Sequence, residues 1–370
     1  IQHYHTLSKM LDGLDIEIGL LTGSTKQSDR NVLHERLLNG DLKIIIGTHA
    51  LIEDTVRFGN LGLVVIDEQH RFGVAQRAKL WKKNENPPHI LVMTATPIPR
   101  TLSLTLYGDL DVSVIDELPP GRKPVKTVHY YDSARLKLFG FLKKQINQGR
   151  QVYIVYPLIQ ESEKMDYKDL EDGYESISRA FPPPDYLVTC VHGRMKPREK
   201  EKAMQYFVKG QSQIMVATTV IEVGVDVPNA SVMVIESAER FGLSQLHQLR
   251  GRVGRGAEQS YCILMSSFKL TGDAKMRIET MVRTNDGFEI AEADMKLRGP
   301  GDMEGTQQSG IPFDLKIASL SKDGQILQYA RQIAEKILDK DPELKDDHNK
   351  LLKAGLLRTK KDTINWSMIS

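Results

Sequence analysis

The sequence predicts an α/β fold with two parallel-sheet units, followed by a smaller and mainly helical region. The chain has 370 residues, and a typical domain size of about 150 residues then suggests two or three units. Short apolar runs end at polar loops and alternate with helical stretches, which is typical of strands buried on both faces of a parallel sheet. After residue 268 this strand pattern gives way to helical stretches.

The expected elements define the domain boundaries. We expect a first unit over residues 1–117, a linker over 118–126, a second unit over 127–268 and helices over 269–370. The linker is rich in Pro and Gly, which breaks both helical and strand patterns. The expected strands are 43–47, 63–66, 90–93, 151–156, 187–191, 213–217, 232–235 and 261–265, and the late helices are 275–283, 289–298, 325–339 and 346–357. No internal sequence repeat is visible, although the two units are compatible with one shared fold.

Composition narrows the choice of function class. Lys and Arg number 50 against 48 Asp and Glu, a net charge of +2, so any contact with nucleic acid must come from local basic faces. Cys190 and Cys262 each lie in an apolar run, which indicates buried hydrophobic residues in a reducing compartment. No apolar run reaches the length of a membrane span and no signal peptide is visible, so we expect a cytoplasmic protein without a membrane partner.

The strongest local motif is a pair of acids at the end of an apolar strand. Asp67 and Glu68 follow Leu63–Ile66, at the sheet edge where α/β proteins place their ligands. One carboxylate can hold Mg²⁺ through water, and the other can orient or deprotonate an attacking water. The alternative is an acid-rich helix N-terminus, which the same residues also favour.

A pair of hydroxyls follows the next strand. Thr94 and Thr96 lie in the segment Met93-Thr94-Ala95-Thr96-Pro97. They can bond a neighbouring carboxylate and so couple the state of a nucleotide to another domain. The alternative is a plain strand-to-helix turn, with a Thr cap and Pro at the first helical position.

Clustered arginines form the third motif, in the order Gln248, Gly251, Arg252, Gly254, Arg255. Arginines this close together can present several guanidinium forks to one polyphosphate. An arginine supplied by a second domain can stabilise charge on a transferring phosphoryl group. The alternative is a solvated basic loop or a patch for the DNA backbone.

The fourth motif runs from Ala217 to Pro228 and follows another apolar strand. Its hydroxyls, Thr218 and Thr219, can contact a nucleic-acid backbone, while Gly224 and Asp226 can serve a nucleotide, the acid by a bond to ribose. The alternative is a buried strand and turn, with Asp226 as a cap.

The four motifs together resemble those of superfamily 2 helicases and translocases, in the expected order. The resemblance implies two RecA-like domains, the first incomplete here, with ATP and Mg²⁺ as cofactors and Asp67 as the Mg²⁺ ligand through water. It implies catalytic roles for Asp67, Glu68, Arg252 and Arg255, and nucleotide binding by Gly224, Asp226 and Gln248. Coupling residues would be Gln69, His70, Thr94, Thr96, Arg298 and Gln308, and nucleic-acid contacts would come from Thr22, Gly23, Thr48, His49, His192, Thr218 and Thr219.

Finer features resemble the RecG family of bacterial branch-migrating DNA helicases. They are Asp67-Glu68-Gln69-His70-Arg71-Phe72-Gly73-Val74, Thr94–Thr101 and the segment Leu297–Gly310, which is similar to a translocation motif. This resemblance implies branched duplex DNA as partner, such as stalled forks and Holliday junctions, in recombination and repair. It also implies a monomer associated with the bacterial nucleoid, with a single-stranded-DNA-binding protein as a candidate partner.

A phosphate-binding loop is not found in the sequence. No Gly-Lys dipeptide occurs, and Gly23-Ser24-Thr25-Lys26 lacks the second glycine that the loop needs. RecG proteins place this loop upstream, so we expect the chain to be a carboxyl-terminal fragment with negligible ATPase activity of its own.

Three alternatives stay open at this point. The transcription-repair coupling factor shares the translocation motif, but it usually carries Glu at the place of Gln69. A degenerate motor acting as a DNA-binding module would have no chemical need for the intact acids and arginines. A metal-dependent nuclease using Asp67 and Glu68 would need further converging acids, and none is evident.

Overall fold

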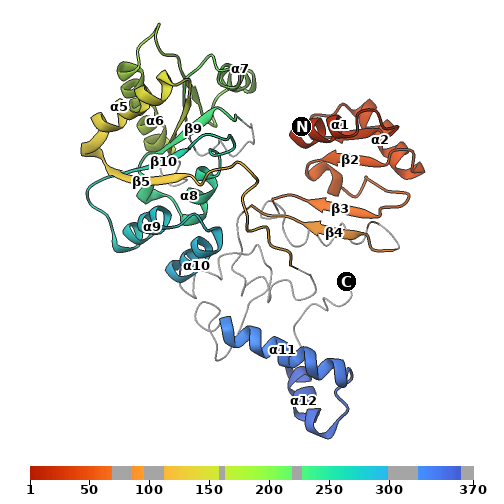
Figure 1. Ribbon diagram of the computed structural model, residues 1–370. Helices are drawn as coiled ribbons and strands as arrows, with labels where there is room; N and C mark the ends of the chain where they lie inside the picture. Colours follow the sequence, from red (N-terminus) through yellow and green to blue (C-terminus); the bar gives the residue numbers. More distant parts are fainter. Residues whose placement is uncertain are drawn as a thin grey trace. The chain divides into compact units, whose positions relative to one another are not determined.

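The structure is a computed structural model that describes residues 1–68, 83, 86–95, 112–157, 163–218, 227–298 and 324–359. The chain divides into two compact units (Figure 1). Unit 1 comprises residues 1–95, 99–113 and 299–370, and unit 2 comprises residues 96–98 and 114–298. Each unit is described separately below.

Unit 2 is built on one six-stranded parallel sheet. The strand order is β5-β10-β9-β6-β8-β7, and every neighbouring pair is parallel. All residues of β6, β8 and β9 are buried, because these central strands are covered on both faces. The strands are β5 Lys126–Tyr131, β6 Gln151–Tyr156, β7 Val188–Val191, β8 Ile214–Thr218, β9 Ala230–Ile235 and β10 Tyr261–Ser266.

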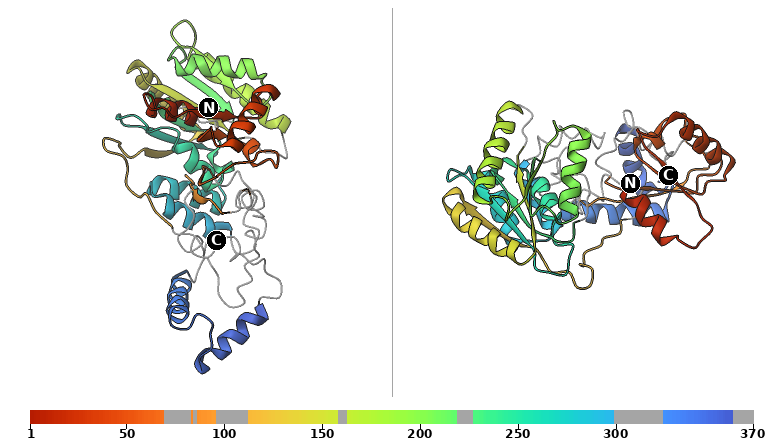
Figure 2. Two further views of the ribbon diagram at one scale, coloured as in Figure 1. Left: turned by 90° about the vertical axis from the view of Figure 1, so that its right-hand side faces the viewer. Right: turned by 90° about the horizontal axis from the view of Figure 1, so that it is seen from above.

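Helices cover both faces of this sheet (Figure 2). One core includes leucines of α5 and apolar residues of α6. The core on the other face includes residues of α7, α8, α9 and α10. The helices are α5 Arg135–Asn147, α6 Glu163–Ala180, α7 Pro197–Val208, α8 Leu243–Arg250, α9 Gly272–Arg283 and α10 Gly287–Arg298, with short 3₁₀ turns η3 Asp132–Ala134 and η6 Ala238–Arg240.

Unit 1 contains two smaller parallel sheets, β1 with β2 and β3 with β4. Ile52 packs in one cluster with Ile66 of β3 and with Ile90 of β4. The elements are α1 Gln2–Met10, β1 Ile18–Leu21, α2 Gln27–Asn39, β2 Ile44–Gly47, η1 His49–Ile52, β3 Leu63–Ile66 and β4 His89–Val92.

The later helices of the chain form a hairpin around Asp341. The helices are α11 Gly324–Lys340 and α12 Lys350–Thr359, with the turn η8 Asp347–Asn349 between them. The Asp341 carboxylate accepts hydrogen bonds from the backbone N–H groups of Lys345 and Asp346 and from the Asn349 amide. These bonds, led by the one from Asn349, hold the pKa of Asp341 below its ordinary value.

A strand–helix–strand segment occurs once in each unit with the same spacing. Ile18 pairs with Ile44 in the first copy and Val188 with Ile214 in the second, a constant separation of 170 residues. The loop bond from Thr25 N–H to the Thr22 carbonyl also has its counterpart, from Met195 to His192, and both measure 3.2 Å. The chain therefore contains an internal structural repeat, although the two copies show no visible repeat in their amino-acid sequence.

The predicted fold class is confirmed: both units are parallel α/β, and helices follow. Two strands were not predicted. The short strand β1 contains Gly19, which weakens a strand pattern, and β5 is an edge strand of mixed polarity beside the linker. No helix in the described ranges is long and apolar enough to cross a membrane.

The predicted boundaries stay a prediction. The helices α9 and α10 pack on α8 in unit 2, although the sequence pattern groups them with the later helices.

Candidate functional site

The two acids of the strongest motif lie directly after β3. The Asp67 carboxylate accepts a hydrogen bond from the Glu68 backbone N–H at 2.9 Å. Glu68 has φ of 53°, a left-handed conformation that non-glycine residues rarely adopt and that tends to occur at functional sites.

Asp67 also contacts a residue that sequence reasoning did not predict for the site. His3 Nε2 lies 3.0 Å from Asp67 Oδ2 and donates to it. The two residues are 64 positions apart, so no local pattern relates them. The Asp67 side chain is 43 % exposed, and an accessible carboxylate is the ligand that Mg²⁺ prefers in proteins. Asp67 therefore fits a Mg²⁺ ion held through water.

Thr94 lies beside these acids, at the end of the neighbouring strand. The Met93 backbone N–H donates to the Ile66 carbonyl at 2.8 Å, which aligns the ends of β3 and β4. Thr94 thus follows one strand end as Asp67 follows the other. Gln69, His70 and Thr96, predicted for the same region, lie outside the described residues.

Two predicted nucleic-acid loops of unit 1 lie next to each other. The first follows β1 and contains Thr22 and Gly23, and the second follows β2 and contains Thr48 and His49. Thr48 donates its backbone N–H to the carbonyl of Leu21 at 3.3 Å. The Thr22 N–H is bound by the Thr25 hydroxyl at 2.9 Å, which closes the first loop into a compact turn.

The repeated segment places two further predicted residues at adjacent strand ends of unit 2. His192 follows β7 and Thr218 ends β8, whose neighbours Val191 and Ala217 are paired. Burial lowers the pKa of His192. Thr218 is fully buried. Thr219, Gly224 and Asp226 lie outside the described residues.

The arginine motif begins on α8 and continues into a tight turn. Gln248 lies on α8, and Arg252 and Arg255 follow it, each half-buried. Gly254 has φ of 85°, and a Cβ there would lie 2.8 Å from Val125 Cγ2, so only glycine fits this turn.

Arg250 lies in the same run of arginines, but its side chain is buried and makes its hydrogen bonds within unit 2. It is 3 % exposed and lies too deep to reach a polyphosphate. Its Nη1 donates to the carbonyls of Met281 at 3.1 Å and Thr284 at 2.8 Å. Its Nη2 lies 3.0 Å from His247 Nδ1 and 3.4 Å from the Asn285 carbonyl. Arg250 therefore ties the arginine motif to the end of α9.

His247 shares this buried environment. Burial, assisted by the charge of Arg250, lowers its pKa to about 4. His247 is therefore neutral at pH 7, which leaves Nδ1 able to accept from the guanidinium of Arg250.

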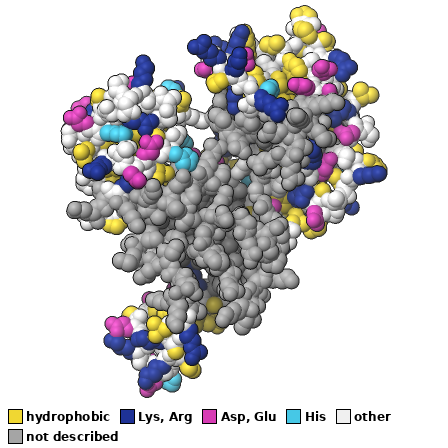
Figure 3. Space-filling model, turned by 180° about the vertical axis from the view of Figure 1, so that it is seen from behind, with side chains coloured by type: hydrophobic (Ala, Val, Ile, Leu, Met, Phe, Trp, Pro, Cys, Tyr) yellow, Lys and Arg dark blue, Asp and Glu magenta, His cyan; other side chains and the backbone are white. Residues whose placement is uncertain are grey.

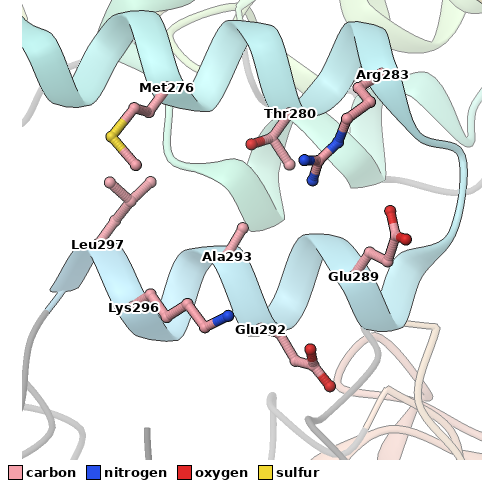
Figure 4. A pocket seen from close by; sticks show the side chains of 8 residues that line it. All are labelled: Met276, Thr280, Arg283, Glu289, Glu292, Ala293, Lys296 and Leu297. Atoms are coloured by element: carbon pink, nitrogen blue, oxygen red, sulfur yellow. The ribbon is translucent and has the colours of Figure 1, made fainter. Parts of the chain in front are cut away.

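Arg298 is the last residue of α10, and Gln308, the other residue predicted for the translocation motif, lies outside the described residues. A hollow of about 350 Å³ lies between α9 and α10 near this end (Figure 4). Its charged lining has both signs, so it selects no single charge of ligand. The lining residues are Met276, Thr280, Arg283, Glu289, Glu292, Ala293, Lys296 and Leu297.

The coloured part of the face in Figure 3 is neither uniformly basic nor uniformly acidic. Basic and acidic side chains are interspersed over the coloured part of that face, in keeping with the net charge of +2. Among the described residues no group of three or more His, Cys, Asp or Glu could hold a metal ion.

Comparison with known proteins defines the class. Residues 1–105 match the DEAD/DEAH box helicase model and residues 136–257 match the helicase conserved C-terminal domain. With the parallel sheets and the strand-end motifs, these matches make the chain a pair of helicase motor domains of the RecA-like type.

The particular family follows from the remaining segment. Residues 284–370 match the model described as ATP-dependent DNA helicase RecG, domain 3, C-terminal. The chain is 54% identical over 343 residues to the ATP-dependent DNA helicase RecG of Synechocystis, covering 93% of this chain and 41% of the relative. It is 48% identical over 362 residues to RecG of Bacillus subtilis, covering 96% and 52%. The chain is therefore similar to RecG proteins over nearly its whole length.

A solved structure supports the same relationship. The structure of RecG bound to a three-way DNA junction matches with a TM-score of 0.65 and 42% identity, covering 88% of this chain and 42% of that one. The helicase MrfA bound to DNA, at 18% identity and a TM-score of 0.56, shares the fold. The chain thus spans about half the length of the relatives it matches.

Proposed function

We propose that this chain forms the motor part of an ATP-dependent DNA helicase that acts on branched duplex DNA. The observation that carries the proposal is the match of residues 284–370 to a RecG-specific model, continuous with two helicase motor domains. The relative solved on a three-way junction supports branched DNA as the substrate. The same matches favour RecG over the transcription-repair coupling factor.

The described residues supply parts of the chemistry. Asp67 would hold Mg²⁺ through water, and the ion would neutralise charge on the nucleotide phosphates. We propose that Glu68 orients the attacking water, and that Arg252 and Arg255 stabilise charge on the transferring phosphoryl group. Gln248 would bind the nucleotide, and Thr94 would report its state from the strand end beside Asp67.

DNA contacts would come from the strand-end loops. We propose that Thr22, Gly23, Thr48 and His49 in unit 1 contact the nucleic-acid backbone. His192 and Thr218 are at the repeated positions in unit 2. Such contacts carry no base readout, so they suit a motor that moves along any duplex.

Further partners and the location of the protein follow the same family. We propose that the protein acts as a monomer on forks and Holliday junctions in the bacterial cytoplasm, associated with the nucleoid. A single-stranded-DNA-binding protein is a candidate partner.

The test is binding of the 370-residue chain to a labelled three-way junction, measured by fluorescence anisotropy over a series of salt concentrations. We expect binding that weakens steeply with salt, because phosphate contacts release counterions. No binding to junction or duplex at low salt, up to about 100 μM chain, would contradict the proposal, since even non-specific binding falls within about 10⁻⁴–10⁻⁶ M at physiological salt and is tighter at low salt.

ATP hydrolysis by the chain itself should be negligible, because the sequence contains no Gly-Lys dipeptide for a phosphate-binding loop. Phosphate release with and without junction DNA would measure this. The matched control is Glu68→Gln: equal residual rates in both proteins mean background hydrolysis. DNA-stimulated turnover at about 1 s⁻¹ or faster, within the usual enzyme range, would contradict the expectation.

A further inference from the structure

The two loops predicted to contact DNA in unit 1 are joined by one arginine. Arg30 lies on α2, and its side chain is only 15 % exposed. Its Nη2 donates to the Thr22 carbonyl at 3.2 Å, and its Nη1 donates to Glu53 Oε2 at 3.1 Å. Thr22 belongs to the first loop, and Glu53 follows η1, the turn that begins at His49 of the second loop.

We infer that Arg30 is a positioning residue that fixes the spacing of these two loops for the nucleic-acid backbone. The inference rests on the proposed function and adds to it a residue with no predicted role. The planar guanidinium presents two donors in a rigid fork, so a single side chain can bind a carbonyl of one loop and a carboxylate beside the other. A lysine ammonium at the same place is a point charge without this fork.

The backbone around Glu53 is held by other groups, so its carboxylate is available for this bridge. Lys83 Nζ donates to the carbonyls of Glu53 and Val56 at 2.6 and 2.7 Å. The Val56 N–H donates to the Glu53 carbonyl as well, at 3.0 Å. Glu53→Gln therefore keeps these backbone bonds after η1 and weakens the contact with Arg30, because the amide oxygen still accepts but carries no charge.

The Thr22 carbonyl of the first loop accepts from Arg30 in addition to the Thr25 N–H within the loop, each at 3.2 Å. The Leu21 carbonyl is bound by the Thr48 N–H, and Arg30 binds the next one, at Thr22. In the repeated segment of unit 2, the position 170 residues after Arg30 holds Lys200. The forked bridge is thus a feature of unit 1 that its repeat does not copy.

A second ion pair on the same helix provides a matched control. Arg36 of α2 binds Glu17 by two bonds of 2.7 Å, and this pair contacts neither loop. Glu17→Gln and Glu53→Gln each remove one negative charge from an arginine pair on α2. General electrostatics predicts that both changes tighten DNA binding slightly, because they raise the net positive charge. Positioning predicts that Glu53→Gln alone weakens it.

The experiment measures the Kd of the 370-residue chain for a fluorescein-labelled three-way junction by anisotropy. We expect Glu53→Gln and Arg30→Gln to weaken binding about five- to tenfold, a loss of the size expected for one ordinary hydrogen bond, because the half-exposed Glu53 is screened by solvent. Arg30→Lys, which keeps the charge, should fail to restore binding. Glu17→Gln should bind at least as tightly as wild type.

Hydrogen exchange measured by mass spectrometry gives the second readout. Peptides covering 22–26 and 48–53 should exchange faster in Glu53→Gln and Arg30→Gln, and not in Glu17→Gln. If Glu53→Gln binds DNA as tightly as Glu17→Gln does, or if Arg30→Lys restores full affinity, the inference is overturned while the proposed function stands. If wild type fails to bind the junction at all, it is the proposed function that fails.

Discussion

Replacing Arg250 with methionine should destabilise unit 2 by about 3 kcal/mol, the net of lost hydrogen bonds and a recovered desolvation cost. The guanidinium donates to the carbonyls of Met281 and Thr284 at 3.1 and 2.8 Å. Each bond to a charged group is worth about 1.5–3 kcal/mol. Its position at the end of α9 adds up to about 1 kcal/mol through the helix dipole.

Part of this loss of stability is offset, because burying the uncharged methionine does not carry the cost of removing a charged guanidinium from water. Burial lowers the pKa of Arg250, which means that the site itself disfavours the charge. The recovered part is worth several kcal/mol for an ion in the interior, so the net falls to about 2–4 kcal/mol. Methionine also keeps the aliphatic stem, so the change tests the guanidinium and not the packing.

Pulsed hydrogen exchange over a urea series would report the unfolding midpoint of unit 2 from peptides of β6, β9 and β10, without interference from unit 1. With a urea dependence of about 2 kcal/mol per molar, a loss of 3 kcal/mol lowers this midpoint by about 1.5 M. The control is Arg283→Met, an exposed arginine at the end of α9, which should stay within about 0.5 kcal/mol of wild type. A midpoint for Arg250→Met equal to that of the control would refute the buried-anchor reasoning.

Three further predictions concern unit 2. His247 has a pKa of about 4 in the fold against 6.5 ordinarily, so its contribution to the stability of unit 2 is complete above pH 6.5 and is lost as pH falls to 4, by at most about 3 kcal/mol. The free energy of unfolding of His247→Gln should therefore depend less on pH over this range. An unchanged slope would contradict this. Gly254→Ala should lower the free energy of unfolding by about 2 kcal/mol or more, because of the positive φ and the close contact with Val125. Gly140→Ala in α5 meets nothing within 4 Å and should stabilise the fold by up to about 1 kcal/mol. Thermal unfolding compares the two variants. Glu236→Gln should cost about 2–3 kcal/mol, because it removes the buried charge that binds Arg135 by two bonds of 2.8 and 2.9 Å and leaves Arg135 only the exposed carboxylate of Asp132. The figure is reduced for solvent screening because the Arg135 side chain is 31 % exposed. A urea midpoint equal to wild type would contradict it.

The sequence by itself determined the fold class and the order of the motifs. Alternating apolar runs and polar loops carry this information locally, because a strand buried on both faces has to be apolar along its whole length. The acids after β3 and the hydroxyl after β4 were located in this way. Their positions at adjacent strand ends follow from parallel pairing.

Only the tertiary structure decided which side chains meet across long separations. The run of arginines near Gly251 looks alike in sequence, yet Arg250 is buried against α9 while Arg252 and Arg255 stay half-exposed. His3 reaches Asp67, and Arg30 joins two loops that lie 26 residues apart in the β1–β2 register. The physical reason is that burial and hydrogen-bond partners depend on the packing of distant elements, and residue type alone does not encode them.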